Sequence, residues 1–246
     1  MIFIFEEAVS SSTCERPSLD MDKESSGAKE PNPFRLALDQ SIQRSRKVRG
    51  GNYVQLATVG TDGGPRVRTV VQRGITGIGR HDSVFKFITD QRSAKVSQIR
   101  KDARGELAWW FLKSSEQYRV AGVLTLHGND EKDEALAALR KQTWGNLRDS
   151  AREQFYWAEP GLPLNESAEQ APEASEGGAE AEAPRPSRIP AGGRDEAGKV
   201  LPAPDAFLLM LLWADSADYL RLTDNHRVVF RREEKNGGWV ASRVNP

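Results

Sequence analysis

Apolar and polar residues alternate in short segments along most of the chain, and this pattern predicts β-strands. Residues 53–59 form a short apolar segment, and residues 66–73 alternate between Arg and apolar positions. The segments 105–112 and 116–128 flank Lys113-Ser114-Ser115 and predict a hairpin. The remaining predicted strands are 83–90, 206–213, 218–222, 226–233 and 238–244, with a tight turn at 235–238.

Helical periodicity is restricted to a few stretches between these strands. The predicted helices cover 31–47, 93–102, 130–142 and 144–157, with Asp130 in position to cap the third. The segment GITGIG at 74–79 follows a strand and opens no helix, so we expect a loop there and not a dinucleotide-binding turn. Many short strands with a few helices predict a mainly β fold with helical additions (α+β), of the β-barrel type.

Two segments lack the apolar residues that a core needs. Residues 1–30 begin with five residues MIFIF and then become acidic and rich in Ser, without the basic start of a signal peptide. Residues 165–199 consist mostly of Ala, Glu, Gly and Pro, and such a segment cannot offset its ordering entropy. We therefore expect a disordered tail at 1–30, a single domain over 31–246 interrupted by a disordered acidic insert at 165–199, and a cytoplasmic location.

Charge and residue counts exclude several classes of site. The chain has 35 Lys and Arg against 35 Asp and Glu, and this balance argues against a nucleic-acid or membrane partner. The single cysteine, Cys14, excludes an intramolecular disulfide and a cysteine zinc site. The three His are far apart, no GxSxG motif is present, and we assign no metal ligand and no catalytic residue.

Basic residues mark one candidate site. Arg68 stands among valines on a predicted strand, and a buried arginine needs an anion or a carboxylate. The corner after the strand at 83–90 brings Ser93 and Lys95 to the start of a helix, where free N–H groups favour anions. Two interpretations remain open on the residues alone: a phosphate-binding cradle, or a capped surface helix with Arg68 paired to a glutamate.

Four segments together resemble the pyridoxamine 5'-phosphate oxidase family. They are RTVVQR at 68–73, FITDQRSAK at 87–95, EQYRVAG at 116–122 and the Arg-rich C-terminal strands with a Trp and a terminal Pro at 226–246. The order and spacing of these segments agree with the family pattern over nearly all of the predicted domain. The resemblance implies an FMN-binding split β-barrel that forms a homodimer with its flavin pocket between two subunits.

The resemblance also implies roles for individual residues. Arg68 and Lys95 would hold the FMN phosphate with help from Ser93, and Gln117 and Arg227 would contact the flavin, Gln117 from across a dimer interface. The residues that would line the flavin are Thr69, Val70, Val71, Ile88 and Thr89. Ile88 takes the place of a family Tyr, and Ala94 that of an Arg that contacts phosphate.

The substrate side matches the family less well. Arg73, Trp144, Arg148 and Arg152 would bind the substrate, the last three on one helical face. On the residues alone, Trp144 and Phe155 are equally well explained as core anchors with the arginines exposed. The family's Arg-Leu-His substrate motif has lost its His. Arg221-Leu222-Thr223 resembles the motif without the His, and counting back from Arg227 instead places Thr223 and Asn225 at its Arg and His.

The resemblance implies an FMN-dependent oxidase that passes a hydride from pyridoxamine or pyridoxine 5'-phosphate to FMN and then to O2. Three alternatives stay open: an FMN reductase with a nicotinamide donor, a non-catalytic FMN-binding or interaction protein, and a barrel that binds another phosphate-bearing ligand.

Overall fold

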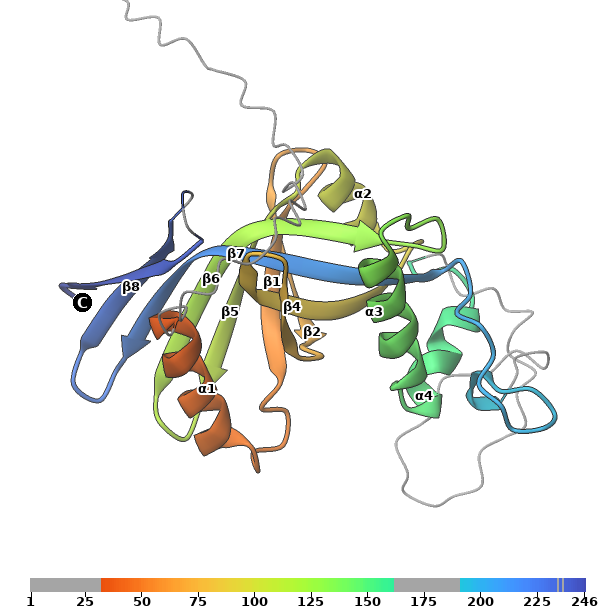
Figure 1. Ribbon diagram of the computed structural model, residues 1–246, viewed down its shortest axis with the longest axis horizontal. Helices are drawn as coiled ribbons and strands as arrows, with labels where there is room; N and C mark the ends of the chain where they lie inside the picture. The colour runs from red at the N-terminus through yellow and green to blue at the C-terminus, as the bar shows by residue number, and fades with distance from the viewer. Residues whose placement is uncertain (1–31, 162–190, 234, 236) are drawn as a thin grey trace, which may run out of the picture.

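The computed structural model describes residues 32–161, 191–233, 235 and 237–246, and these form one antiparallel sheet with helices at its ends (Figure 1). The predicted N-terminal tail and most of the predicted insert lie outside the described residues. The strands follow the order β2-β1-β5-β6-β7-β4-β3, with β8 added to β7 and β9 added to β8. The prediction of a mainly β barrel with helical additions is confirmed.

The strands have lengths typical of a small barrel, apart from the long β6 and β7. Their bounds are β1 Tyr53–Val59, β2 Pro65–Val71, β3 Ile75–Ile78, β4 His81–Asp90, β5 Arg104–Phe111, β6 Glu116–His127, β7 Phe207–Arg221, β8 His226–Arg232 and β9 Trp239–Val244. Along one edge of β7, its first half pairs with β4 and its second half with β8. The other edge of β7 pairs with β6. One strand thus links the barrel to the small β7-β8-β9 sheet.

Backbone hydrogen bonds close the barrel where β2 leads into β3. Arg73 donates its N–H to the carbonyl of Lys86 at 2.8 Å, and Lys86 donates to the carbonyl of Gly74 at 2.9 Å. Gly74 has φ of 123°, which a residue with a side chain rarely adopts. The expected loop at 74–79 is therefore wrong in part, because its glycines bend the chain into a short strand against β4.

Within the described residues, four α-helices cover the ends and one side of the sheet: α1 Pro33–Ser45, α2 Ala94–Lys101, α3 Glu134–Gly145 and α4 Asp149–Glu153. In Figure 1, α1 and α2 lie at opposite ends of the barrel, and α3 and α4 lie beside the start of β7, which pairs with the end of β4. The cap of α3 is Asp133 and not Asp130, because the Asp133 side chain accepts from the N–H of Leu136 at 2.9 Å. No helix in the described part of the chain is long and apolar enough to cross a membrane.

The barrel interior holds the main core. Phe34 and Leu38 of α1 pack with inward-facing residues of the strands, and Ile99 of α2 joins them from the other end. A second, smaller cluster contains Trp144 and Phe155 from the helical side and Phe207 from β7. The helices are thus anchored by burial of their apolar faces against the sheet.

Two predicted strands, 206–213 and 218–222, are one strand in the structure. Asp215 and Ser216 interrupt the apolar pattern, but the backbone ladder with β6 continues past them through a β-bulge at Ala121/Gly122. A Cβ at Gly122 would lie 1.9 Å from the carbonyl oxygen of Trp213, so the bulge accepts only glycine there.

The described chain resumes at residue 191, inside the range predicted for the insert. Ala191–Gly193 form a 3-10 turn, η3, and Arg194 bridges Val200. Gly192 and Gly193 have positive φ and are buried against α4. Small residues let the backbone approach the helix closely, so Gly192 and Gly193 pack without the large apolar side chains on which the prediction depended, while residues 195–199 are exposed.

Candidate functional site

Arg68 lies on the inward face of β2, opposite Leu56 of β1. Its guanidinium donates to the Leu56 carbonyl at 3.1 Å, the Thr58 hydroxyl at 2.7 Å and the Gln98 amide oxygen at 2.8 Å. All these partners are neutral, so the alternative in which Arg68 pairs with a glutamate does not occur. Burial lowers the pKa of Arg68, as expected for a cation removed from water without a counter-charge.

Lys95 approaches the same place from the first turn of α2. Its ammonium donates to the Ser93 hydroxyl at 2.9 Å and to the Thr89 hydroxyl at 3.2 Å. Burial lowers the pKa of Lys95, the positive charge of Arg68 lowers it further, and Asp90 opposes both. The two cations therefore lie close enough to repel each other.

The nearby carboxylate does not neutralise this pair. Asp90 is held by Arg92, whose guanidinium donates to it at 2.6 and 2.9 Å. In the described chain, neither Arg68 nor Lys95 forms an ion pair. Ser93 is the N-cap of α2 without a side-chain cap bond, so the helix presents free N–H groups beside the cations. The residues present fit a phosphate dianion, which would supply the missing negative charge.

Gln98 and Thr58 were missed by the sequence analysis. Gln98 lies in α2 between the buried Val96 and Ile99, and its amide oxygen accepts from Thr58 at 2.7 Å and from Arg68. A buried amide is a signal for a polar network, but the sequence does not show which side chain Gln98 meets. Together these residues fix the orientation of the Arg68 guanidinium.

The predicted flavin-lining residues divide between two faces. Thr69 and Val71 lie on the outer face of β2, while Val70 packs partly on the core and Thr89 is buried beside Lys95. Ile88 packs against the cluster of Trp144 and Phe207.

Gln117 and Arg227 do not join the Arg68–Lys95 group within one chain. Gln117 of β6 pairs with Leu220 of β7, and Leu220 pairs with Arg227 of β8. The side chains of these three residues therefore form one row across the strands, on the outer face of the sheet. Trp110 of β5 continues the row and is 42% exposed. The guanidinium of Arg227 is held by Asp218 at 3.0 and 2.7 Å.

Among the predicted substrate residues, Arg73 and Arg148 lie close enough for their charges to interact. Burial lowers the pKa of Arg73, and Arg148 lowers it further while Tyr53 opposes. The Nε of Arg73 is buried without a hydrogen-bond partner in the described chain. Arg148 is exposed at the N-cap of α4.

The expected single helical face for Trp144, Arg148 and Arg152 is wrong, because α3 ends at Gly145 and α4 begins at Asp149. Trp144 is buried and donates its indole N–H to the Leu201 carbonyl at 2.7 Å. Arg152 is 1% exposed, donates to the carbonyls of Gly192 at 2.8 Å and Leu147 at 2.5 Å, and pairs with Asp149. Both side chains therefore face the protein interior.

Comparison with known proteins agrees with this arrangement. The family model of the pyridoxamine 5'-phosphate oxidase FMN-binding domain matches residues 31–128. A crystal structure of a pyridoxamine 5'-phosphate oxidase-related, FMN binding protein from Nostoc punctiforme PCC 73102 is 30% identical, with a TM-score of 0.70 over 88% of this chain and 99% of that one. The chain belongs to the pyridoxamine 5'-phosphate oxidase-related family. FMN is the cofactor of this family and of the matched domain.

Two further relatives extend the comparison. The pyridoxine/pyridoxamine 5'-phosphate oxidase 2 of Arabidopsis thaliana is 27% identical over 217 residues, which are 87% of this chain and 97% of the relative. PhzG from Burkholderia lata 383 is 15% identical, with a TM-score of 0.64 over 88% of this chain and 94% of that one, and so shares the fold. The similarity to members of the pyridoxamine 5'-phosphate oxidase-related family thus extends over nearly the whole described chain.

Proposed function

We propose that this chain is an FMN-dependent oxidoreductase in which Arg68, Lys95 and Ser93 hold the FMN phosphate. The observation that carries the proposal is a pair of adjacent, partly desolvated cations whose hydrogen-bond partners are all neutral. Such a pair is destabilised by mutual repulsion until an anion binds between its members. The α2 N-terminus adds N–H groups and a favourable dipole at the same place.

The chemistry that bound FMN supplies is the acceptance of a hydride. The chain's own residues bind and orient, and no residue is required to transfer a proton. Arg68 is held by Thr58 and Gln98, so the phosphate meets a guanidinium already in position. Val70, on the same face of β2 as Arg68, supports a flavin next to this anchor, whereas Thr69 and Val71 face the opposite side of the strand.

On the substrate side, Arg73 and Arg148 are the residues that we expect to bind an anionic group. Neither has an ion-pair partner in the described chain, and their charges interact. The names of the relatives favour a B6 vitamer phosphate such as pyridoxamine 5'-phosphate. Trp144 and Arg152 would act indirectly, by fixing the loop that carries Arg148.

The loss of the family's substrate His supports a second candidate, a reductase that takes its hydride from a nicotinamide donor. Asn225 stands at the position of this His and has φ of 55° in the turn between β7 and β8. An asparagine carries no positive charge for a substrate phosphate.

One experiment separates these activities. Purified protein loaded with FMN is mixed anaerobically with pyridoxamine 5'-phosphate, pyridoxine 5'-phosphate or NADPH, and the flavin absorbance is followed. Bleaching by a B6 phosphate, with peroxide release when air is admitted, supports the oxidase. Bleaching by NADPH alone supports the reductase, and a bound flavin that none of them bleaches would contradict both.

A further inference from the structure

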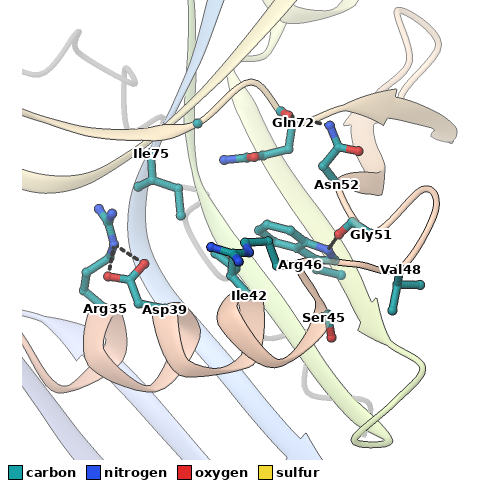
Figure 2. Close-up of a pocket in the computed structure, with 12 residues that line it drawn as sticks. Arg35, Asp39, Ile42, Ser45, Arg46, Val48, Gly51, Asn52, Gln72 and Ile75 are labelled. Atoms are coloured by element: carbon teal, nitrogen blue, oxygen red, sulfur yellow. Dashed lines mark hydrogen bonds and ion pairs between the residues drawn. The ribbon is translucent and has the colours of Figure 1, made fainter.

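A pocket separate from the Arg68–Lys95 group opens between α1 and the connection from β2 to β3 (Figure 2). Its volume is about 390 Å³, at the lower end of the range for small-molecule sites. Neither Arg68 nor Lys95 lines it. Its walls come from α1, from the segment before β1 and from β3 and β5, so it is distinct from the Arg68–Lys95 site.

Gln72 is the feature of this pocket that calls for a ligand. The residue is 7% exposed, and Figure 2 shows its side chain extending from the strand end into the pocket. Its backbone is satisfied, since its N–H donates to Asn52 at 2.9 Å and its carbonyl accepts from the Asn52 side chain at 3.3 Å. Its side-chain amide has no hydrogen-bond partner in the described chain. The amide atoms open into the pocket and are not sealed from solvent, so a ligand group can replace water as their hydrogen-bond partner.

The walls beside Gln72 are apolar. Ile42 of α1 and Ile75 of β3 line the pocket together with Trp109 of β5. The indole N–H of Trp109 already donates to the Gly51 carbonyl at 2.8 Å, so the ring offers only its carbon surface. Flat aromatic molecules pack well against such a surface.

The rim carries one uncompensated positive charge. Arg35 is paired with Asp39 at 2.9 Å, and these two charges cancel. Arg46 forms no ion pair in the described chain, and Figure 2 shows its side chain beside Ile42. A carboxylate at the rim would supply the missing partner.

We propose that this pocket binds a small aromatic or heteroaromatic carboxylate. The ring lies against Ile42, Ile75 and Trp109, the carboxylate pairs with Arg46, and a hydrogen-bonding group on the ring edge pairs with the Gln72 amide. This proposal does not rest on the proposed function, because no group of the Arg68–Lys95 site takes part in it.

Calorimetric titration of the FMN-loaded protein with three probes tests the assignment. Pyridine-3-carboxylate carries both the charge and a ring acceptor, benzoate lacks the ring nitrogen, and pyridine-3-carboxamide lacks the charge. We expect saturable binding of pyridine-3-carboxylate, with benzoate about 5-fold weaker and the carboxamide about 10-fold weaker. Absence of saturable binding of all three probes would overturn the proposal.

Substitutions assign the contacts. Gln72→Leu should bring the affinity for pyridine-3-carboxylate down to that for benzoate and leave the affinity for benzoate unchanged, because only the ring nitrogen loses its partner. Arg46→Gln should abolish the preference for carboxylates, while the matched control Lys47→Gln, next to Arg46 and outside the pocket lining, should not. An unchanged preference in Gln72→Leu contradicts the proposal. So does loss of probe binding in Arg68→Ala/Lys95→Ala, which would place the probe in the flavin site.

Discussion

Gln98 determines where the guanidinium of Arg68 can point. Its amide oxygen accepts from Arg68 at 2.8 Å and from Thr58 at 2.7 Å, and the residue is buried in α2. An amide oxygen fixes the arginine without cancelling its charge, whereas a carboxylate at the same place would cancel it. The neutrality of this position is thus what leaves Arg68 available to a phosphate.

Substitution of Gln98 tests this reasoning. Gln98→Leu removes one support of Arg68 and should weaken FMN binding by roughly 5- to 10-fold. Gln98→Glu introduces a carboxylate that competes with the phosphate, and the loss should be larger, on the order of 100-fold. Quenching of flavin fluorescence measures both. FMN binding by Gln98→Glu as tight as by the original protein would contradict the role of Arg68.

Lys95 should make FMN affinity depend on pH. Burial and then the charge of Arg68 lower its pKa below the ordinary range for lysine. In the window between the lowered folded pKa and the unfolded pKa, the unfolded chain binds more protons, so the stability of the FMN-free protein should rise with pH there. FMN binding needs the ammonium, so its affinity should fall as pH rises through the folded pKa.

The measurement is the dissociation constant of FMN from about pH 7 to about pH 10, with riboflavin as the ligand that lacks the phosphate. We expect the fall to be absent in Lys95→Met and absent for riboflavin. An equal fall for both ligands would mean that Lys95 does not contact the phosphate.

At the scale of elements, α4 and η3 form a clamp around Arg152. The guanidinium holds the carbonyls of Gly192 and Leu147, and Asp149 pairs with both Arg152 and Arg194. The clamp joins two parts of the chain that are far apart in sequence and fixes the loop that presents Arg148. We therefore expect Arg152 to stabilise the fold and Arg148 to bind the substrate, although both belong to the same short segment.

Two substitutions separate these roles. Arg152→Ala should lower the free energy of unfolding by about 2–4 kcal/mol, because it leaves buried carbonyls without donors. Arg148→Ala, at an exposed position, should change it by less than about 0.5 kcal/mol and should instead raise the KM for an anionic substrate. Urea unfolding and steady-state kinetics check the pair. A larger loss of stability in Arg148→Ala than in Arg152→Ala would contradict the role of the clamp.

The positions of helices and strands could be predicted from the sequence where the periodicity and the turn residues agreed. The strands at 53–59 and 116–127 and the helix at α1 lie as the pattern predicted. Failures occurred where a tertiary contact overrode the local pattern. The ladder with β6 carries β7 through Asp215, and positive φ lets Gly192 and Gly193 pack against α4. The expected single helical face for Trp144, Arg148 and Arg152 failed because residues 146–148 interrupt the helix.

Charged residues among valines and at a helix start marked a phosphate site at Arg68 and Lys95 as one of two open interpretations, and the family resemblance favoured the phosphate site. The support from Gln98 and Thr58 could not be predicted, since it depends on the packing of α2 against β1. Periodicity shows which face of an element is buried but not which polar atoms meet there.

At the scale of the whole molecule, two groups of candidate flavin residues lie on different parts of one chain. Arg68 and Lys95 meet inside the barrel end near α2, while Gln117 and Arg227 share an outer row with Trp110. Trp110 is 42% exposed and Val67, on the outer face of β2, is 70% exposed. We expect a homodimer in which the outer row of one subunit faces the β2 surface of the other.

Trp110→Glu tests the dimer. A buried charge at the interface should shift the protein to a monomer by light scattering and weaken FMN binding at least about 10-fold. The matched control is Leu112→Glu. Leu112 directly follows β5 and is 71% exposed, so this substitution should leave FMN binding unchanged if the dimer buries only the outer row. A monomeric Trp110→Glu protein with full FMN affinity would show that one subunit suffices.

The contact between the two cations and the phosphate is tested most directly by comparing FMN with riboflavin, which differ only in that group. Titration calorimetry gives both dissociation constants for the original protein, for Arg68→Ala/Lys95→Ala and for the control Arg66→Ala, whose arginine pairs with Asp62 on the surface. We predict a strong preference for FMN in the original protein and in Arg66→Ala, and nearly equal binding of the two ligands by the double variant. A double variant that still prefers FMN as strongly as the original protein would contradict the account.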